Sequence, residues 1–175
     1  MTLNLNRIVP WFGAVNTENM SKVMAELVKL NKEDRDARIT LFVMTAGGSS
    51  AIGFGFYDVV RGMNLPIDTV GSGFVDSMGV IIFLVGKHRL VTPHTSMLIH
   101  EGRRYFSEKE TITRRDSLAY QEESELYKGF YEGIVEENTD GRIAPTQLED
   151  MMLHNTVLNP DRMIELGLAH GLWTP

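Results

Sequence analysis

The apolar run "GVIIFLVG", residues 79 to 86, constrains the fold of this chain more than any other feature. It has no polar face, so other elements must cover it on all sides. It is far shorter than the roughly 20 residues that cross a bilayer. A chain of 175 residues can bury such a segment within one core. We therefore expect a single domain over residues 1–175, with this run near its centre.

Strand-like and helix-like patterns alternate along the first hundred residues. Apolar residues at helical spacing predict helices over residues 16–34, 51–63 and 77–86, with Thr17 or Asn19 as the first N-cap. Runs rich in β-branched and aromatic residues predict strands at "RIVPWFG", "RITLFVMT", "PIDTVGSG", "HRLVT" and "SMLIH". This order favours an α/β domain with largely buried parallel strands.

The section from Glu101 to about Asp150 is rich in charge and predicts a long projecting helix. Its apolar stripe is thinner than that of a core helix, which indicates that the stripe packs against something else. The stripe consists of Leu118, Leu126, Phe130, Ile134 and Val135. Two short helices should follow, one with Pro145 in its first turn and one closed by Gly167, before a terminal strand or tail.

Composition argues against several partners and cofactors. Lys and Arg number 17 against 23 Asp and Glu, and basic residues do not alternate with aromatic ones, so we expect no nucleic acid partner. The chain has no cysteine, which removes disulfides and cysteine-based metal sites. Nothing indicates a cofactor, a leader peptide or a membrane segment. We expect a cytoplasmic protein.

Two glycines and one serine could take part in chemistry. Gly47 and Gly48 follow a predicted strand, and their amides could hold an anionic oxygen or simply form a tight turn. Ser77 precedes the apolar run, where the amide of Met78 and the helix dipole would favour negative charge. The serine is either a nucleophile or an ordinary N-cap.

His100 ends the predicted strand "SMLIH". A histidine at such a position is a candidate general base, and it is also a common surface residue. Each of these signals is weak alone, but their order along the chain is specific.

Three motifs in this order resemble the proteolytic subunit of the Clp protease, the ClpP family of serine peptidases. They are "TAGG" at 45–48, "DSMG" at 76–79 and "LIHEG" at 98–102, and the likeness continues through "RIVPWFG", "FGFYDVV" and "MIELGLAHG". The resemblance implies a ClpP/crotonase-like spiral of β-β-α units, with a handle over about residues 103–145. Asp76 stands where the family usually has alanine.

The resemblance also implies a mechanism. Ser77 would attack the peptide carbonyl after His100 takes its proton, and the amides of Gly48 or Gly47 and of Met78 would hold the oxyanion. The third catalytic position, usually aspartate in the family, aligns with Asn155. The implied activity is serine-type endopeptidase hydrolysis of unfolded proteins or peptides inside a ring-shaped oligomer.

The implied partners are further copies of the chain, in a heptameric ring or double ring, and an AAA+ ATPase unfoldase. Only about six residues precede "RIVPWFG", whereas the family uses a longer segment to contact that ATPase, which argues against the unfoldase. Asn155 leaves open a weakly active or inactive ring subunit with a structural role. An acyl-CoA enzyme on the related crotonase fold is a further alternative.

Overall fold

The computed structural model describes residues 5–103 and 111–173. Its main feature is an entirely parallel five-stranded sheet in the order β1-β2-β3-β4-β7. These strands are β1 (Ile8–Phe12), β2 (Ile39–Thr45), β3 (Ile67–Val75), β4 (Arg89–Val91) and β7 (Gly171–Leu172). A second, antiparallel pair joins β5 (Met97–Ile99) to β6 (Thr156–Leu158). The α/β class and the parallel strands predicted from the sequence are confirmed.

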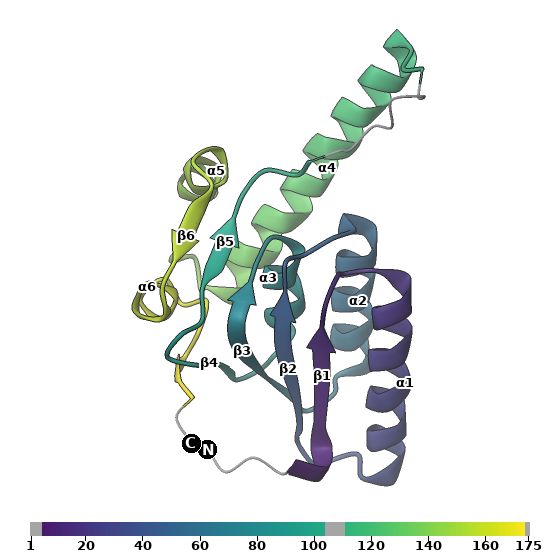
Figure 1. Ribbon diagram of the computed structural model, residues 1–175, viewed down its shortest axis with the longest axis vertical. Helices are drawn as coiled ribbons and strands as arrows, with labels where there is room; N and C mark the ends of the chain where they lie inside the picture. Colours follow the sequence, from purple (N-terminus) through teal and green to yellow (C-terminus); the bar gives the residue numbers. More distant parts are fainter. Residues whose placement is uncertain (1–4, 104–110, 174–175) are drawn as a thin grey trace.

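Helices cover the sheet and extend beyond it. They are α1 (Thr17–Glu33), α2 (Ser50–Met63), α3 (Met78–Phe83), α4 (Arg114–Asn138), α5 (Pro145–Leu153) and α6 (Pro160–Glu165). Figure 1 shows α1 and α2 side by side against the sheet, while the first half of α4 projects past it. The projecting helix is therefore present as predicted. Residues 104–110 of the predicted handle region lie outside the described residues.

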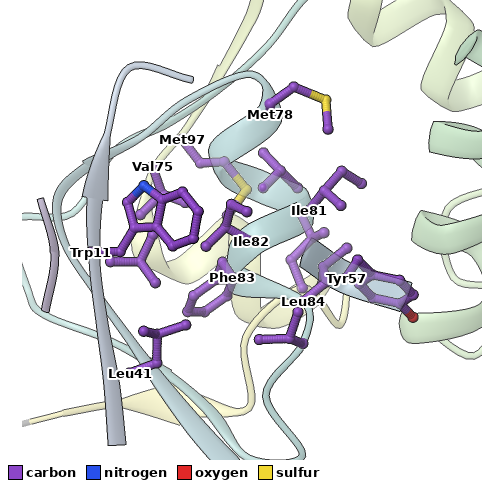
Figure 2. Packing of buried hydrophobic residues seen from close by; sticks show 14 of the residues in the cluster. Trp11, Leu41, Tyr57, Val75, Met78, Ile81, Ile82, Phe83, Leu84 and Met97 are labelled. Atoms are coloured by element: carbon purple, nitrogen blue, oxygen red, sulfur yellow. The ribbon is translucent and has the colours of Figure 1, made fainter. Parts of the chain in front are cut away.

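The predicted central run forms α3, and all six of its residues are buried. Figure 2 shows Ile81, Ile82 and Phe83 inside the cluster that also contains Trp11 and Met97. Burying an aliphatic or aromatic side chain of this size contributes about 1.5–3 kcal/mol. This packing holds α3, and with it Ser77, in a fixed place.

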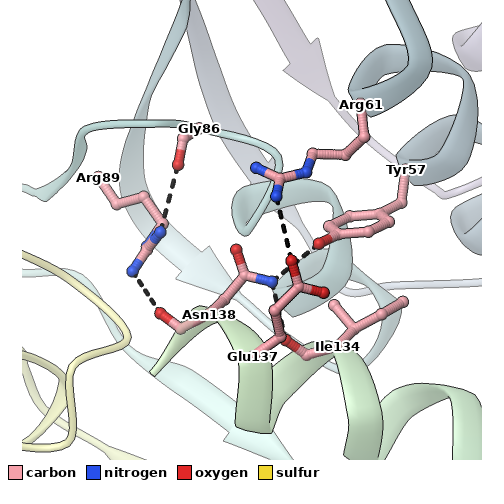
Figure 3. A network of polar contacts seen from close by, with 7 residues as sticks. All are labelled: Tyr57, Arg61, Gly86, Arg89, Ile134, Glu137 and Asn138. Atoms are coloured by element: carbon pink, nitrogen blue, oxygen red, sulfur yellow. Dashed lines mark hydrogen bonds and ion pairs between the residues drawn. The ribbon is translucent and has the colours of Figure 1, made fainter. Parts of the chain in front are cut away.

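Arg89 anchors the base of α4 to the domain. Its guanidinium donates to the carbonyl oxygens of Asn138 at 2.7 Å, Leu168 at 2.8 Å and Gly86 at 3.3 Å. Asn138, the last residue of α4, donates in turn from Nδ2 to the hydroxyl of Tyr57 on α2 at 2.8 Å (Figure 3). Burial lowers the pKa of Arg89. The projecting helix is thus held at its C-terminal end.

Two local features differ from the sequence prediction. The N-cap of α1 is Asn16, not Thr17 or Asn19, and its side chain accepts from the Asn19 amide at 2.9 Å. Asn16 has the extended backbone that a cap needs, whereas Thr17 is already helical. Strand β6 is not predicted by the sequence pattern.

Among the described residues, no helix is both long enough and apolar enough to cross a membrane.

Candidate active site

Ser77 lies between β3 and α3. Its backbone has φ +58° and ψ −125°, a conformation that residues other than glycine rarely adopt. Such a backbone costs about 1–3 kcal/mol and is typical of functional positions. Although Ser77 occupies the N-cap position of α3, its side chain makes no capping hydrogen bond. Its amide donates to the carbonyl of Leu98 on β5 at 2.8 Å. The ordinary N-cap interpretation therefore fails, and the hydroxyl is left for another task.

Gly47 packs directly against Ser77. A Cβ at Gly47 would lie 2.7 Å from Ser77 Cβ and 3.1 Å from the amide nitrogen of Met78, and its φ of +90° also favours glycine. The Gly47 amide donates to Thr45 Oγ1 at 3.0 Å, so it is already paired.

Two other amides near this turn, one on each side in the chain, are not paired in this way. Met78 begins α3, so its N–H has no acceptor within the helix. Gly48 is exposed, and within the described residues the structure gives its amide no acceptor. Of the alternatives left open by the sequence, the geometry favours Gly48 over Gly47 as the partner of Met78 in an oxyanion hole.

His100 directly follows β5 and is half-buried. Its Nδ1 lies 2.6 Å from the carbonyl oxygen of Glu101. Because a carbonyl can only accept, Nδ1 carries the proton in this arrangement, and Nε2 of the neutral ring presents a lone pair. That is the tautomer that a general base needs. No hydrogen bond joins His100 to the Ser77 hydroxyl, although Ser77 and β5 are bonded through Leu98.

Asn155 directly precedes β6. In the β5–β6 ladder Ile99 pairs with Thr156, so His100 and Asn155 lie next to the last pair, at the same end of the ladder. Asn155 itself has a left-handed backbone with φ +48° and is not part of the ladder. The Asn155 side chain is exposed, and its Oδ1 accepts from Arg103 Nη2 at 3.1 Å. The sequence predicts Asn155 at the third catalytic position and gives no signal of its contact with Arg103. The role of Asn155 as the third catalytic residue stays a prediction.

Asp76 is the other residue that sequence reasoning did not assign to the site. Its Oδ1 accepts from the backbone amide of Leu98 at 2.9 Å, so the carboxylate is directed toward β5. Burial raises the pKa of Asp76, while the Leu98 amide and His100 lower it. The only sign in the sequence that Asp76 belongs to the site is its position next to Ser77. This position does not show in which direction the Asp76 side chain points.

Within residues 5–103 and 111–173, no group of three or more histidine, aspartate or glutamate side chains could hold a metal ion.

Comparisons with known proteins identify a family and several relatives. The family model described as Clp protease matches residues 1–174. The chain is 35% identical over 97 residues to the ATP-dependent Clp protease proteolytic subunit 2 of Thermobifida fusca, covering 54% of this chain and 48% of that protein.

Two further relatives give the same picture. The ATP-dependent Clp protease proteolytic subunit 2 of Cutibacterium acnes is 34% identical over 98 residues, which cover 55% of this chain and 46% of that protein. The ATP-dependent Clp protease proteolytic subunit 1 of Leifsonia xyli is 34% identical over 99 residues, which cover 55% of this chain and 50% of that protein. The chain spans about half the length of the curated relatives it matches. Because the family model extends over nearly the whole chain, the chain belongs to the Clp protease family.

Proposed function

We propose that the chain is a serine endopeptidase that hydrolyses peptide bonds of unfolded proteins or peptides. The observation that carries this proposal is the backbone of Ser77, held at positive φ against Gly47 at the start of α3, with a hydroxyl that makes no capping hydrogen bond. A strained turn between a strand and a helix is also how hydrolases on other folds expose a nucleophilic serine. Family membership supports the same chemistry.

The proposed reaction has two stages. His100 Nε2 takes the hydroxyl proton while Ser77 Oγ attacks the peptide carbonyl, and the Gly48 and Met78 amides donate to the oxyanion. Collapse breaks the C–N bond, and the imidazolium gives its proton to the leaving amine. Water, deprotonated by His100, then hydrolyses the acyl-enzyme. Catalytic hydrogen bonds are often long before substrate binds, so the unbonded Ser77–His100 pair is compatible with this role.

Asn155 would complete the constellation as a neutral third residue. Its place next to the Ile99–Thr156 pair, at the same end of the β5–β6 ladder as His100, supports this assignment. An amide oxygen can orient an imidazole ring, but it supplies no charge to the imidazolium.

The proposal includes assembly into a homo-oligomeric ring, heptameric in a single or double layer, in the cytoplasm. Leu118, Leu126 and Phe130 are about half exposed along α4, a row of apolar side chains that a monomer leaves in water. The relatives are named ATP-dependent, which supports an AAA+ ATPase as partner of the assembled protein.

Labelling with a fluorophosphonate tests the proposal. We expect the full chain to be labelled and to cleave a fluorogenic peptide, and Ser77→Ala to lose both while keeping its circular dichroism spectrum. Ser72→Ala, a nearby control on β3, should retain both. A folded wild-type chain that is neither labelled nor active would favour the structural ring subunit. Turnover of acyl-CoA without peptide cleavage would favour the crotonase-like alternative.

A further inference from the structure

We propose that Asp76 supplies the negative charge that stabilises the protonated ring of His100, a role that the neutral Asn155 cannot fill. This inference rests on the proposed peptidase function. Asp76 would be a positioning residue, because it acts through His100 and does not touch the substrate.

Asp76 is held in place against β5. Asp76 Oδ1 accepts from the Leu98 amide at 2.9 Å, and the amide of the next residue, Ser77, donates to the Leu98 carbonyl at 2.8 Å. Two consecutive residues are therefore tied to one residue of β5. The carboxylate is held on the strand that leads to His100 and cannot turn freely into solvent.

His100 follows Leu98 by two residues, so the residue that holds the Asp76 carboxylate lies about 7 Å from His100 along the extended chain. Burial raises the pKa of Asp76, and the Leu98 amide and then the charge of His100 oppose this rise. Nδ1 of His100 is already bonded to the Glu101 carbonyl, so Asp76 would act on the ring through its charge and not through a hydrogen bond to that nitrogen.

Other charged groups near His100 are less suited to this role. Glu101 and Arg103 follow it in the chain and are exposed, and Arg103 is bonded to Asn155. On α5 and at its end, Asp150 and His154 are exposed and paired with each other at 3.3 Å. Asp76 is half-buried, and a charge in such a place is screened less by water and salt.

In the proposed site, two groups would together perform the two functions of a catalytic aspartate, which are to fix the tautomer of the histidine and to stabilise its charge. The carbonyl of Glu101 holds the Nδ1 proton and fixes the tautomer of His100. Asp76 provides the negative charge as the ring becomes an imidazolium.

Asp76→Asn is the decisive variant, because the amide oxygen can still accept from Leu98 while the charge is lost. We expect kcat to fall at least about tenfold, and the acid limb of the kcat/KM profile to move to lower pH because protonated His100 loses its counter-charge. Asp150→Asn removes an exposed aspartate and should change neither. A purely structural Asp76 would leave rate and pH profile of the Asn variant intact, which would overturn the proposal.

A measurement without turnover separates this inference from the proposed function. The Asp76 carboxyl can be titrated by ¹³C NMR in the wild type, in His100→Gln and in the control His154→Gln. We expect the pKa of Asp76 to rise only in His100→Gln, because a cation has been removed beside it. An unchanged pKa would overturn the inference even in an active enzyme. An inactive wild type with the expected rise would refute the peptidase and leave the Asp76–His100 interaction established.

Discussion

The guanidinium of Arg103 donates to Oδ1 of Asn155 at 3.1 Å, so the side chain at the proposed third catalytic position is already bonded to a cation. A negative charge placed at residue 155 would interact with this cation as well as with the ring of His100, the proposed base. The effect of restoring an aspartate there therefore depends on Arg103.

Asn155→Asp alone should raise kcat by less than about threefold, because Arg103 would pair with the new carboxylate. In an Arg103→Gln background the same change should raise kcat by about tenfold, equivalent to about 1.4 kcal/mol of barrier. Steady-state kinetics of the four proteins of this double-mutant cycle measure the difference. Equal effects in both backgrounds would show that Arg103 does not control residue 155.

Gly47→Ala should abolish fluorophosphonate labelling. It should also lower the free energy of unfolding by about 1–3 kcal/mol. The new methyl group would meet Ser77 Cβ at 2.7 Å, and φ at this position is +90°. Gly55→Ala is the matched control, because nothing lies within 4 Å of its Cβ position in α2, and it should stabilise the protein by about 0.5–1 kcal/mol. Urea denaturation checks both values.

Arg89→Met should lower the free energy of unfolding by about 3–5 kcal/mol, since it leaves several buried carbonyl groups without their donor. Arg162→Met removes an exposed arginine that forms a surface ion pair with Glu165, and should cost less than about 1 kcal/mol. Thermal unfolding compares the two. Similar losses would show that the Arg89 network contributes little to holding the base of α4.

Protonation of His170 should destabilise the fold below about pH 6.5. Its Nδ1 accepts from the Arg89 amide at 3.0 Å, and burial, followed by the Arg89 charge, lowers the pKa of His170. Its contribution is therefore fully present above the unfolded value of about 6.5 and is lost as pH falls through the lower folded value. Urea unfolding at pH 7.5 and 5.5 should show a smaller pH effect in His170→Gln than in the wild type.

Leu126→Glu should reduce assembly, because it places a charge in the exposed apolar row of α4, where Leu126 is 54% exposed. Ser124→Glu adds the same charge at a neighbouring exposed position of the helix and should leave the assembly intact. Multi-angle light scattering gives the masses. A wild-type monomer at micromolar concentration would contradict the proposed ring and the role of this row.

Most of the α/β framework could be predicted from the sequence because its signals are long and local. The apolar pattern that predicts α3 is continuous over residues 79–86, and all of α3 is buried. Strand β6 could not be predicted in this way. It has only three residues, and its pairing with β5, about 57 residues earlier in the chain, leaves no local pattern.

The sequence motifs predict which residues form the proposed site, but not the contacts of those residues. They left Gly47 and Gly48 as alternatives, since the difference between the two amides depends on a hydrogen bond from Gly47 to Thr45. The direction of Asp76 likewise depends on a tertiary bond to Leu98. Pairings between distant segments carry no periodic signal along the chain.

The β5–β6 ladder also sets the order in which the site can be completed during synthesis. His100 is made early, but the strand that lies beside its segment spans Thr156–Leu158, beyond the whole of α4. Closing so long a loop is slow compared with forming local structure. A ribosome-bound chain that ends before residue 156 therefore lacks β6, the strand that pairs with β5 next to His100. The nascent chain already contains Ser77, but it cannot yet have the arrangement proposed for peptide cleavage.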